Sequence, residues 1–404
     1  MQIFVNTKFD FVKWRFHAVV FSLIWIVIGA VMFVKHGINW GIDFAGGANI
    51  VLRFKDKVPV DLLRGLLTDA SIQQYGKAED NAVLIRLPEQ KKESDYAGNT
   101  VNRLNLALNP EAAGGKVDLN FRGRESVTDL LFQADPDHKG TGPDARKYYE
   151  NVAQNIISKR SEVGLFRNMQ QALSVNGVTT GIAGVLNGKT FLGSFNVLNQ
   201  ETVGPQVGRE LQQKAIWAIV LSTLAMGAYL WIRFDIMFGA AAIVCIIHDV
   251  CMSLAFLGMI NGEASLNIVA ALLLIVGFSI NDTVVMYDRV RENRRKIKTR
   301  MTFEEQLNLA MNQTLSRTIL TSGSVVIVLI ALILFGGKVI HEFAWILLIG
   351  VLAGTYSTIT IVPAVAIFWN NVTGRAHDLS GPAVRARVEA PPPAAPPQRK
   401  RKVG

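Results

Sequence analysis

The sequence predicts a polytopic α-helical membrane protein with six transmembrane helices and one α+β domain outside the membrane. Half of the 404 residues are hydrophobic, and about half of these lie in six apolar runs. Each run is long enough to cross a hydrocarbon layer about 30 Å thick. A mixed segment of about 175 residues, enough to bury a core of its own, separates the first run from the second. The runs are 18–34, 214–232, 236–260, 266–287, 317–335 and 343–369.

The charge distribution predicts which side of the membrane each connection occupies. The formal net charge is +10, and Lys and Arg gather in residues 1–17, 288–316 and 370–404. Because short cytoplasmic segments are enriched in Lys and Arg, both termini are expected in the cytoplasm and residues 35–213 outside. The first run exceeds the usual apolar core of a signal peptide, about 7 to 15 residues, and no small-x-small cleavage pattern follows it, so we expect it to be retained. The basic surplus therefore indicates topology, and no nucleic-acid partner is predicted.

The segment outside the membrane alternates strand-like and helix-like stretches. Gly46 and Gly47 permit a tight turn before a strand at 49–54. A helix in "PVDLLRGLLTDA" and a second strand in "NAVLIRL" would complete a β-α-β unit. Two further helices are expected in "TVNRLNLAL" and "DARKYYENVAQNIISKR". The strand-like stretch "GKTFLGSFNVLNQETVGPQVGREL" then leads into the second membrane helix.

No residue pattern predicts a cofactor, a metal site or a disulfide. Cys245 and Cys251 lie six residues apart on the third run and therefore point to different helix faces, while residues 35–213 contain no cysteine. A Gly-rich phosphate loop with its Lys is also absent from the sequence, so ATP hydrolysis is not predicted.

Two carboxylates interrupt the apolar runs. An Asp at the centre of a membrane helix costs about 2.5 to 3.5 kcal/mol, so each is a functional candidate by default. Asp282 lies six residues before Asp288, roughly 9 Å inside the cytoplasmic edge. Asp249, which follows His248, lies 13 residues beyond Ile236, roughly 20 Å from the same edge. His248 and Asp249 could serve either as a proton relay or as interhelical hydrogen bonds.

A basic residue stands close to Asp282 in the predicted bundle. Arg317 lies at the cytoplasmic mouth of the fifth run between Ser316 and Thr318. Burial favours the protonated form of a lone carboxyl group, whereas an approaching guanidinium favours the ionised form. A bundle that alternately brings Arg317 to Asp282 and removes it would bind and release one proton per cycle.

A structural interpretation of the same residues stays open. Asp282 and Arg317 could form a static ion pair, with Asn281, Thr283 and the neighbouring hydroxyl groups as interhelical hydrogen bonds. Gly350 and Gly354 form a Gly-x-x-x-Gly pair on the sixth run, which predicts close helix packing.

Six stretches, in order, resemble the SecF family of the SecD/SecF protein-export system. They are "GIDFAGG", "ETVGPQVGREL", "HDV", "SINDTVVMYDRVREN", "NQTLSRTILTS" and "IGVLAGTYS". The resemblance covers residues 40–87 and 200–370 and implies half of a bundle of the resistance-nodulation-division (RND) type. It implies proton-relay roles for Asp282 and Arg317. Outside the membrane it implies a family motif of Gly41, Asp43, Gly46, Gly47, Gly204 and Pro205.

The resemblance also implies a location, an energy source and partners. We expect the cytoplasmic (inner) membrane, with the proton-motive force driving export and no cofactor. The implied partners are a SecD-like subunit, the SecY/SecE/SecG channel, YidC, YajC and unfolded secretory polypeptides. The tail 370–404 is a polyproline spacer with a basic tip, which favours contact with anionic lipid.

One region departs from the resemblance, and two other functions compete. Residues 88–199 exceed the usual family length, so about 110–190 is predicted to be an insertion.

A proton-driven small-molecule exporter of the same superfamily would share the membrane aspartate, but such exporters usually carry two six-helix halves. An intramembrane aspartyl protease would need Asp249 and Asp282 to share a proton, which a depth difference of roughly 10 Å opposes. No enzymatic activity is therefore expected.

Overall fold

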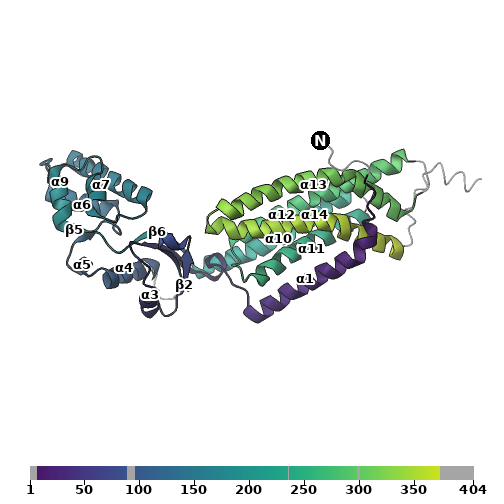
Figure 1. Ribbon diagram of the computed structural model, residues 1–404, viewed down its shortest axis with the longest axis horizontal. Coiled ribbons are helices and arrows are strands. Elements are labelled where there is room, and N and C mark those ends of the chain that lie inside the picture. The colour runs from purple at the N-terminus through teal and green to yellow at the C-terminus, as the bar shows by residue number, and fades with distance from the viewer. Residues whose placement is uncertain (1–6, 89–95, 235, 298–300, 374–404) are drawn as a thin grey trace, which may run out of the picture. The chain divides into compact units, whose positions relative to one another are not determined.

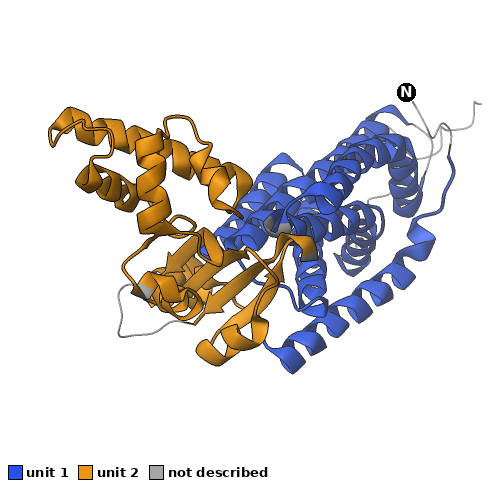
Figure 2. Ribbon diagram, turned by 60° about the vertical axis from the view of Figure 1, so that its left-hand side comes forward, with its two compact units in different colours: residues 1–39, 215–404 blue, residues 40–214 orange. Residues whose placement is uncertain are grey.

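The computed structural model describes residues 7–88, 96–234, 236–297 and 301–373 (Figure 1). The chain divides into two compact units (Figure 2). We call residues 1–39 with 215–404 the helical unit, and residues 40–214 the α+β unit. Residues 374–404, which make up nearly all of the predicted tail 370–404, and the first six residues of the N-terminal segment lie outside the described residues.

Six helices in the described part of the chain are long and apolar enough to span a membrane. They are α1 (Arg15–His36, preceded by the 3-10 turn Val12–Trp14), α10 (Pro205–Arg233), α11 (Ile236–Met259), α12 (Leu266–Lys296), α13 (Phe303–Phe335) and α14 (Lys338–Thr373). One apolar run lies in each. The six helices confirm the sequence prediction of a multi-pass membrane protein.

Two of these helices continue beyond their apolar runs into the charged connection 288–316. α12 ends at Lys296, where Glu292 lies between Arg289 at i−3 and Lys296 at i+4 and pairs with both. α13 begins with a capping box, in which Thr302 and Glu305 each accept a hydrogen bond from the backbone N–H of the other. Local charge pairing and capping therefore extend the helices past the end of the hydrophobic signal.

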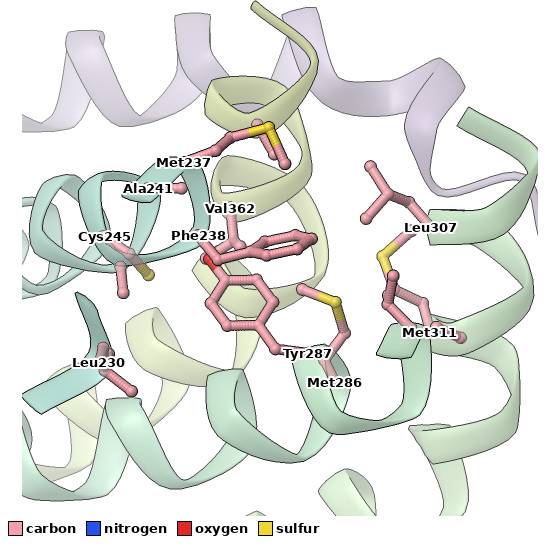
Figure 3. Packing of buried hydrophobic residues seen from close by; sticks show 14 of the residues in the cluster. Leu230, Met237, Phe238, Ala241, Cys245, Met286, Tyr287, Leu307, Met311 and Val362 are labelled. Carbon is pink, nitrogen blue, oxygen red and sulfur yellow. The ribbon is translucent and has the colours of Figure 1, made fainter. Parts of the chain in front are cut away.

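The core of the helical unit forms around α14. This helix packs against α11, α12 and α13, while α1 packs against α11. At the end where α11 begins, the buried cluster includes Phe238, Tyr287 and Met311 (Figure 3). Gly29 permits the closest approach of α1, because an added Cβ would lie 2.3 Å from the Cα of Ala255.

The α+β unit contains a four-stranded antiparallel sheet in the order β2-β3-β1-β6. The strands are β1 (Gly47–Phe54), β2 (Ser71–Tyr75), β3 (Ala82–Leu87) and β6 (Phe195–Val203). The predicted β-α-β unit is wrong: β1 and β3 are antiparallel neighbours, because the chain passes through α3 (Val60–Leu66) and then β2 before β3. The sequence "SIQQY" of β2 is polar and largely exposed, so it lacks the apolar pattern of a buried strand.

A helical lobe lies between β3 and β6 in the sequence. The chain first runs through α4 (Tyr96–Leu108), which packs on the sheet, and α5 (Pro110–Ala113). The lobe follows as β4 (Val117–Asp118), α6 (Arg124–Ala134), α7 (Pro143–Val163), α8 (Met169–Leu173), α9 (Thr180–Lys189) and β5 (Thr190–Phe191), with β4 parallel to β5. The helices expected in "TVNRLNLAL" and "DARKYYENVAQNIISKR" are confirmed.

The lobe has a hydrophobic core separate from that of the sheet. Tyr149 and Phe166 are fully buried in it. Asn120, also fully buried, donates to the carbonyl groups of Phe166 at 3.0 Å and Gly193 at 2.9 Å, and accepts from the N–H of Phe166. The lobe coincides closely with the predicted insertion at 110–190, whose status as an insertion stays a prediction.

Candidate functional site

Asp249 lies at the meeting point of three helices. Its exposed fraction is 0%. Oδ2 accepts hydrogen bonds from the hydroxyl groups of Ser279 on α12, at 2.5 Å, and Ser357 on α14, at 3.0 Å. Oδ1 lies 2.8 Å from Nδ1 of His248. The thiol of Cys245, one turn earlier on α11, points at the same carboxylate, with Sγ 3.8 Å from Oδ2. Both carboxylate oxygens therefore have partners.

His248 extends this network to α1. Its Nε2 lies 2.8 Å from the hydroxyl oxygen of Ser22, which in turn lies 3.3 Å from the Tyr356 hydroxyl. Tyr356 donates to the carbonyl of Ala18 at 2.6 Å. A neutral imidazole that donates from Nδ1 to the carboxylate accepts at Nε2. The network thus satisfies its members from Asp249 to the backbone of α1.

Asp282 is equally buried but has poorer partners. Its exposed fraction is 2%. Oδ2 lies 3.5 Å from the hydroxyl of Ser322 on α13, at the outer limit for a hydrogen bond. Oδ1 has no partner among the residues that the structure describes. Thr355 on α14 donates to the same Ser322 hydroxyl at 2.7 Å. The second carboxylate is therefore buried with half of its bonding capacity unmet.

Arg317, the predicted partner of Asp282, forms no ion pair with it in this conformation. Arg317 is exposed on α13, and within the described ranges no nitrogen of Arg317 comes within 4.0 Å of the Asp282 carboxylate. Asn281 is also exposed, since adjacent helical residues differ by about 100° in direction. The structure thus shows a separated pair rather than the static ion pair that the sequence left open.

The remaining candidates in the membrane helices line the packed faces. Thr283 is buried on α12 and its hydroxyl oxygen lies 3.2 Å from that of Thr358 on α14. Thr318 is buried and Ser316 is half-buried on α13. The contact between Thr283 and Thr358 serves the packing of α12 against α14.

Gly350 and Gly354 bring α14 close to its neighbours. An added Cβ at Gly350 would lie 2.1 Å from Cδ1 of Ile275, and one at Gly354 would lie 3.3 Å from Cβ of Ser279. Because Ser279 and Ser357 both reach Asp249, this close approach of α12 and α14 is what lets two hydroxyl groups meet one carboxylate.

The depth difference that the sequence predicts between the two aspartates is too large. Asp249 contacts Ser279, three residues before Asp282 on the same helix, which corresponds to a rise of about 4.5 Å. The estimate of roughly 10 Å measured both depths from the ends of apolar runs, whereas α12 continues to Lys296. The two carboxylates nevertheless have separate partners.

The predicted motif outside the membrane also comes together in the structure. Gly41 precedes the short helix α2 (Ile42–Ala45), which contains Asp43. Gly46 and Gly47 then adopt positive φ values of 77° and 118°, which favour glycine. An added Cβ at Gly46 would lie 3.1 Å from the Cα of Pro205, which follows Gly204 at the start of α10. The two halves of the motif thus pack against each other.

No sequence pattern predicts a role for the four residues that complete the network of Asp249, namely Ser22, Ser279, Tyr356 and Ser357. A weak signal was present for three of them. Ser279 lies three residues before Asp282, and Tyr356 and Ser357 follow Gly354 within one turn, where close packing was already predicted. Small hydroxyl residues beside a packing glycine are placed to bond across the interface.

Two family models match the chain. Residues 186–372 match "Protein export membrane protein SecD/SecF, C-terminal", and residues 31–58 match the "SecD/SecF GG Motif". The second match contains Asp43, Gly46 and Gly47, and the first contains both buried aspartates.

Relatives along nearly the full chain carry one name. The "Protein translocase subunit SecF" of Koribacter versatilis is 35% identical over 402 residues, covering 95% of this chain and 98% of the relative. The protein of the same name from Desulfurispirillum indicum is 30% identical over 366 residues, covering 89% of this chain and 91% of the relative.

The fold is similar to that of a solved membrane protein. The crystal structure of SecDF, a translocon-associated membrane protein from Thermus thermophilus, matches with a TM-score of 0.61 and 26% identity over 91% of this chain. This chain spans only 39% of that longer chain. Given the identity to full-length relatives, the chain belongs to the SecF family of protein translocase subunits.

Proposed function

We propose that this chain, a SecF-family translocase subunit, couples the proton-motive force to polypeptide export through Asp282. The observation that supports this role is the buried carboxylate with one unpartnered oxygen and one long hydrogen bond. A buried charge without compensating partners is costly, and the neutral protonated carboxyl costs much less. Among the two aspartates, Asp282 is therefore the group whose protonation changes the energy of the bundle most.

Arg317 supplies the second state of the proposed cycle. In the present conformation it is exposed and separated from Asp282, which suits a protonated carboxyl. A shift of α13 against α12 that brings the guanidinium to the carboxylate would stabilise the ionised form and release the proton. The hydroxyl groups of Thr355 on α14 and Ser322 on α13 form a short chain that ends at the Asp282 carboxylate. In the proposed cycle these hydroxyl groups carry the proton to and from that carboxylate.

Asp249 has a different proposed role. Its two oxygens are bonded to side chains of α11, α12 and α14, and His248 links it to α1. We assign His248 and Asp249 to interhelical bonding, because a carboxylate with satisfied partners gains little from taking up a proton. The separate partners of Asp249 and Asp282 also oppose the protease alternative, so the proposed function includes no enzymatic activity.

Exposed polar residues support a membrane-embedded partner. Asn281 on α12 and Arg317 on α13 both face outward from the bundle, where contact with lipid hydrocarbon would be costly. The longer SecDF chain, of which this chain matches 39%, supports a SecD-like subunit as that partner. Further proposed contacts are the SecY/SecE/SecG channel, YidC, YajC, unfolded secretory polypeptides and, for the tail 370–404, anionic lipids.

The proposed orientation follows from the positions of basic residues. Lys and Arg gather before α1, between α12 and α13, and after α14, which supports a cytoplasmic location for both termini and a location outside the cytoplasmic membrane for the α+β unit. In this orientation the α+β unit faces polypeptides that emerge from the channel.

An export assay tests the coupling role. Cells depleted of this subunit are resupplied with the native chain, Asp282→Asn or the matched control Asp249→Asn, and a secreted precursor is followed with and without an uncoupler. We expect Asp282→Asn to assemble normally but to lack the uncoupler-sensitive part of export, and Asp249→Asn to retain most of it. Full export by Asp282→Asn would overturn the proposal.

A further inference from the structure

A cavity of about 190 Å³ opens in the helical unit where α10, α11 and α12 come together. Its polar lining consists of three arginines: Arg233 at the end of α10, and Arg291 and Arg294 on α12. Aromatic side chains form most of the remaining wall, namely those of Phe234, Phe238 and Tyr287. No carboxylate is among the lining residues in the described part of the chain.

Aromatic rings hold two of the three guanidinium groups. Arg233 lies over the ring of Phe234, with 5.1 Å between its Cζ and the ring centroid. Arg294 lies over Phe238 at 6.0 Å and over Phe303 at 5.6 Å, and its Nε donates to Gln306 at 3.0 Å. A ring face positions a guanidinium without consuming its N–H groups. Neither Arg233 nor Arg291 forms an ion pair with any described carboxylate.

The base of the cavity is aromatic. The rings of Phe238 and Tyr287 lie 4.4 Å apart between centroids, and both side chains are buried (Figure 3). Three guanidinium groups therefore line one small space with an aromatic base.

The position of the cavity along the helices indicates the ligand. Arg233 is the last residue of the span in α10, Ile236 is the first of the span in α11, and Tyr287 ends the apolar run of α12. The cavity therefore lies where the hydrocarbon layer ends, which is the level of phospholipid phosphates. Basic pockets between helices at this level suit anionic headgroups, and the aromatic wall suits the first part of an acyl chain.

We propose that this cavity binds the phosphate of an anionic phospholipid. The guanidinium groups of Arg233 and Arg291 contact the phosphate oxygens, and the ring pair of Phe238 and Tyr287 forms the apolar base. Asp235, which follows Phe234 in the chain, lies outside the described residues. The site is independent of the proton-coupling role of Asp282, because it uses none of the same side chains.

Lipid binding by the purified full-length protein tests the site. The protein in a non-ionic detergent is titrated with phosphatidylglycerol, with phosphatidylcholine and with inorganic phosphate, and retained ligand is measured by native mass spectrometry. Phosphatidylglycerol should bind in preference to phosphatidylcholine. The double variant Arg233→Gln/Arg291→Gln should weaken that binding by about tenfold, because each arginine near the headgroup contributes to the attraction.

The control removes the same charge outside the cavity. Arg209→Gln/Arg295→Gln should bind phosphatidylglycerol as the native chain does, and both double variants should unfold at the native temperature without lipid. Equal weakening in both double variants would show general surface charge and overturn the site. Equal binding of the two lipids would overturn it as well. Displacement of the lipid by millimolar inorganic phosphate would show a free-phosphate site instead of a lipid site.

Discussion

Asp249 and Asp282 are buried to the same extent in the same helical unit, yet their surroundings are opposite. Asp249 has hydrogen-bond partners on both oxygens from α11, α12 and α14. Asp282 has one hydroxyl at 3.5 Å and one oxygen without a partner among the described residues. Buried polar groups are normally satisfied, so an unsatisfied one needs an explanation. Unmet bonding capacity, rather than burial, therefore distinguishes the carboxylate for which we propose proton coupling from the one for which we propose interhelical bonding.

The largest expected effect is the loss of the Asp249 carboxylate. Asp249→Ala leaves the hydroxyl groups of Ser279 and Ser357 and the ring of His248 without their common acceptor. Each buried donor that loses its partner costs about 1 to 3 kcal/mol. We expect the free energy of unfolding to fall by about 3 kcal/mol or more, measured by thermal unfolding in detergent.

The same measurement on two isosteric variants sharpens the comparison. Asp249→Asn keeps one acceptor oxygen but turns the other into an N–H donor, so it should lose about 1 to 3 kcal/mol. Asp282→Asn removes a charge that has few partners, so it should unfold within about 1 kcal/mol of the native protein. If Asp282→Asn unfolds as easily as Asp249→Ala, the carboxylate of Asp282 is structural and the contrast between the two sites fails.

A packing change should damage the Asp249 site next most strongly. In Gly350→Leu the new side chain meets Ile275, whose Cδ1 lies 2.1 Å from the position of an added Cβ, and the Oγ of Ser253 at 3.0 Å. Overpacking of this kind costs about 1 to 3 kcal/mol. We expect a stability loss of about 2 kcal/mol by thermal unfolding.

Gly277 on α12 is the matched control for this change. An added Cβ at Gly277 has no neighbour within 4 Å, so Gly277→Ala should leave stability unchanged or raise it by up to about 1 kcal/mol. Equal losses in Gly350→Leu and Gly277→Ala would show that α14 does not depend on its close approach to α12.

Much of the helical unit could be predicted from the sequence, because the bilayer makes the hydrophobic signal strong. One apolar run lies in each of the six helices, and Asp282 stands out because a charge inside such a run is costly. The partners of Asp249 could not be predicted with equal ease. Ser279 and Ser357 reach it from different helices, and the rotation of each helix about its axis depends on packing that hydropathy does not specify.

Two sequence predictions are wrong, the depth difference of the aspartates and the β-α-β unit, because hydropathy does not detect charged helix ends or exposed strands. The depths of the aspartates were measured from the ends of apolar runs, whereas charge pairs continue α12 to Lys296. The strand β2 was missed because an exposed edge strand such as "SIQQY" carries no apolar alternation. Its presence reverses the direction of the next strand, so a β-α-β unit was predicted where the sheet is antiparallel.

Removal of single hydroxyl groups should reproduce the contrast at a smaller scale. Ser357→Ala removes a 3.0 Å bond to Asp249 and should lower stability by about 1 kcal/mol. Ser322→Ala removes the 3.5 Å contact to Asp282 and the hydroxyl that accepts from Thr355. Its loss of stability should be about half that of Ser357→Ala. The second variant should instead alter the dependence of export on external pH. If stability falls more in Ser322→Ala than in Ser357→Ala, the contact with Asp282 is stronger than its length indicates.

The smallest expected effect on stability comes from Arg317, although its effect on export should be large. Arg317 is exposed, and the described residues offer it no ion pair within 4.0 Å, so Arg317→Gln should change the free energy of unfolding of the isolated subunit by less than about 0.5 kcal/mol. Export should nevertheless lose its uncoupler-sensitive part, because the ionised form of Asp282 would have no cation to approach. A stability loss above about 2 kcal/mol would instead show that the two residues spend most of their time as a buried ion pair, since breaking such a pair leaves an uncompensated charge. The carboxylate of Asp282 would then be satisfied like that of Asp249, with Arg317 on α13 as its partner.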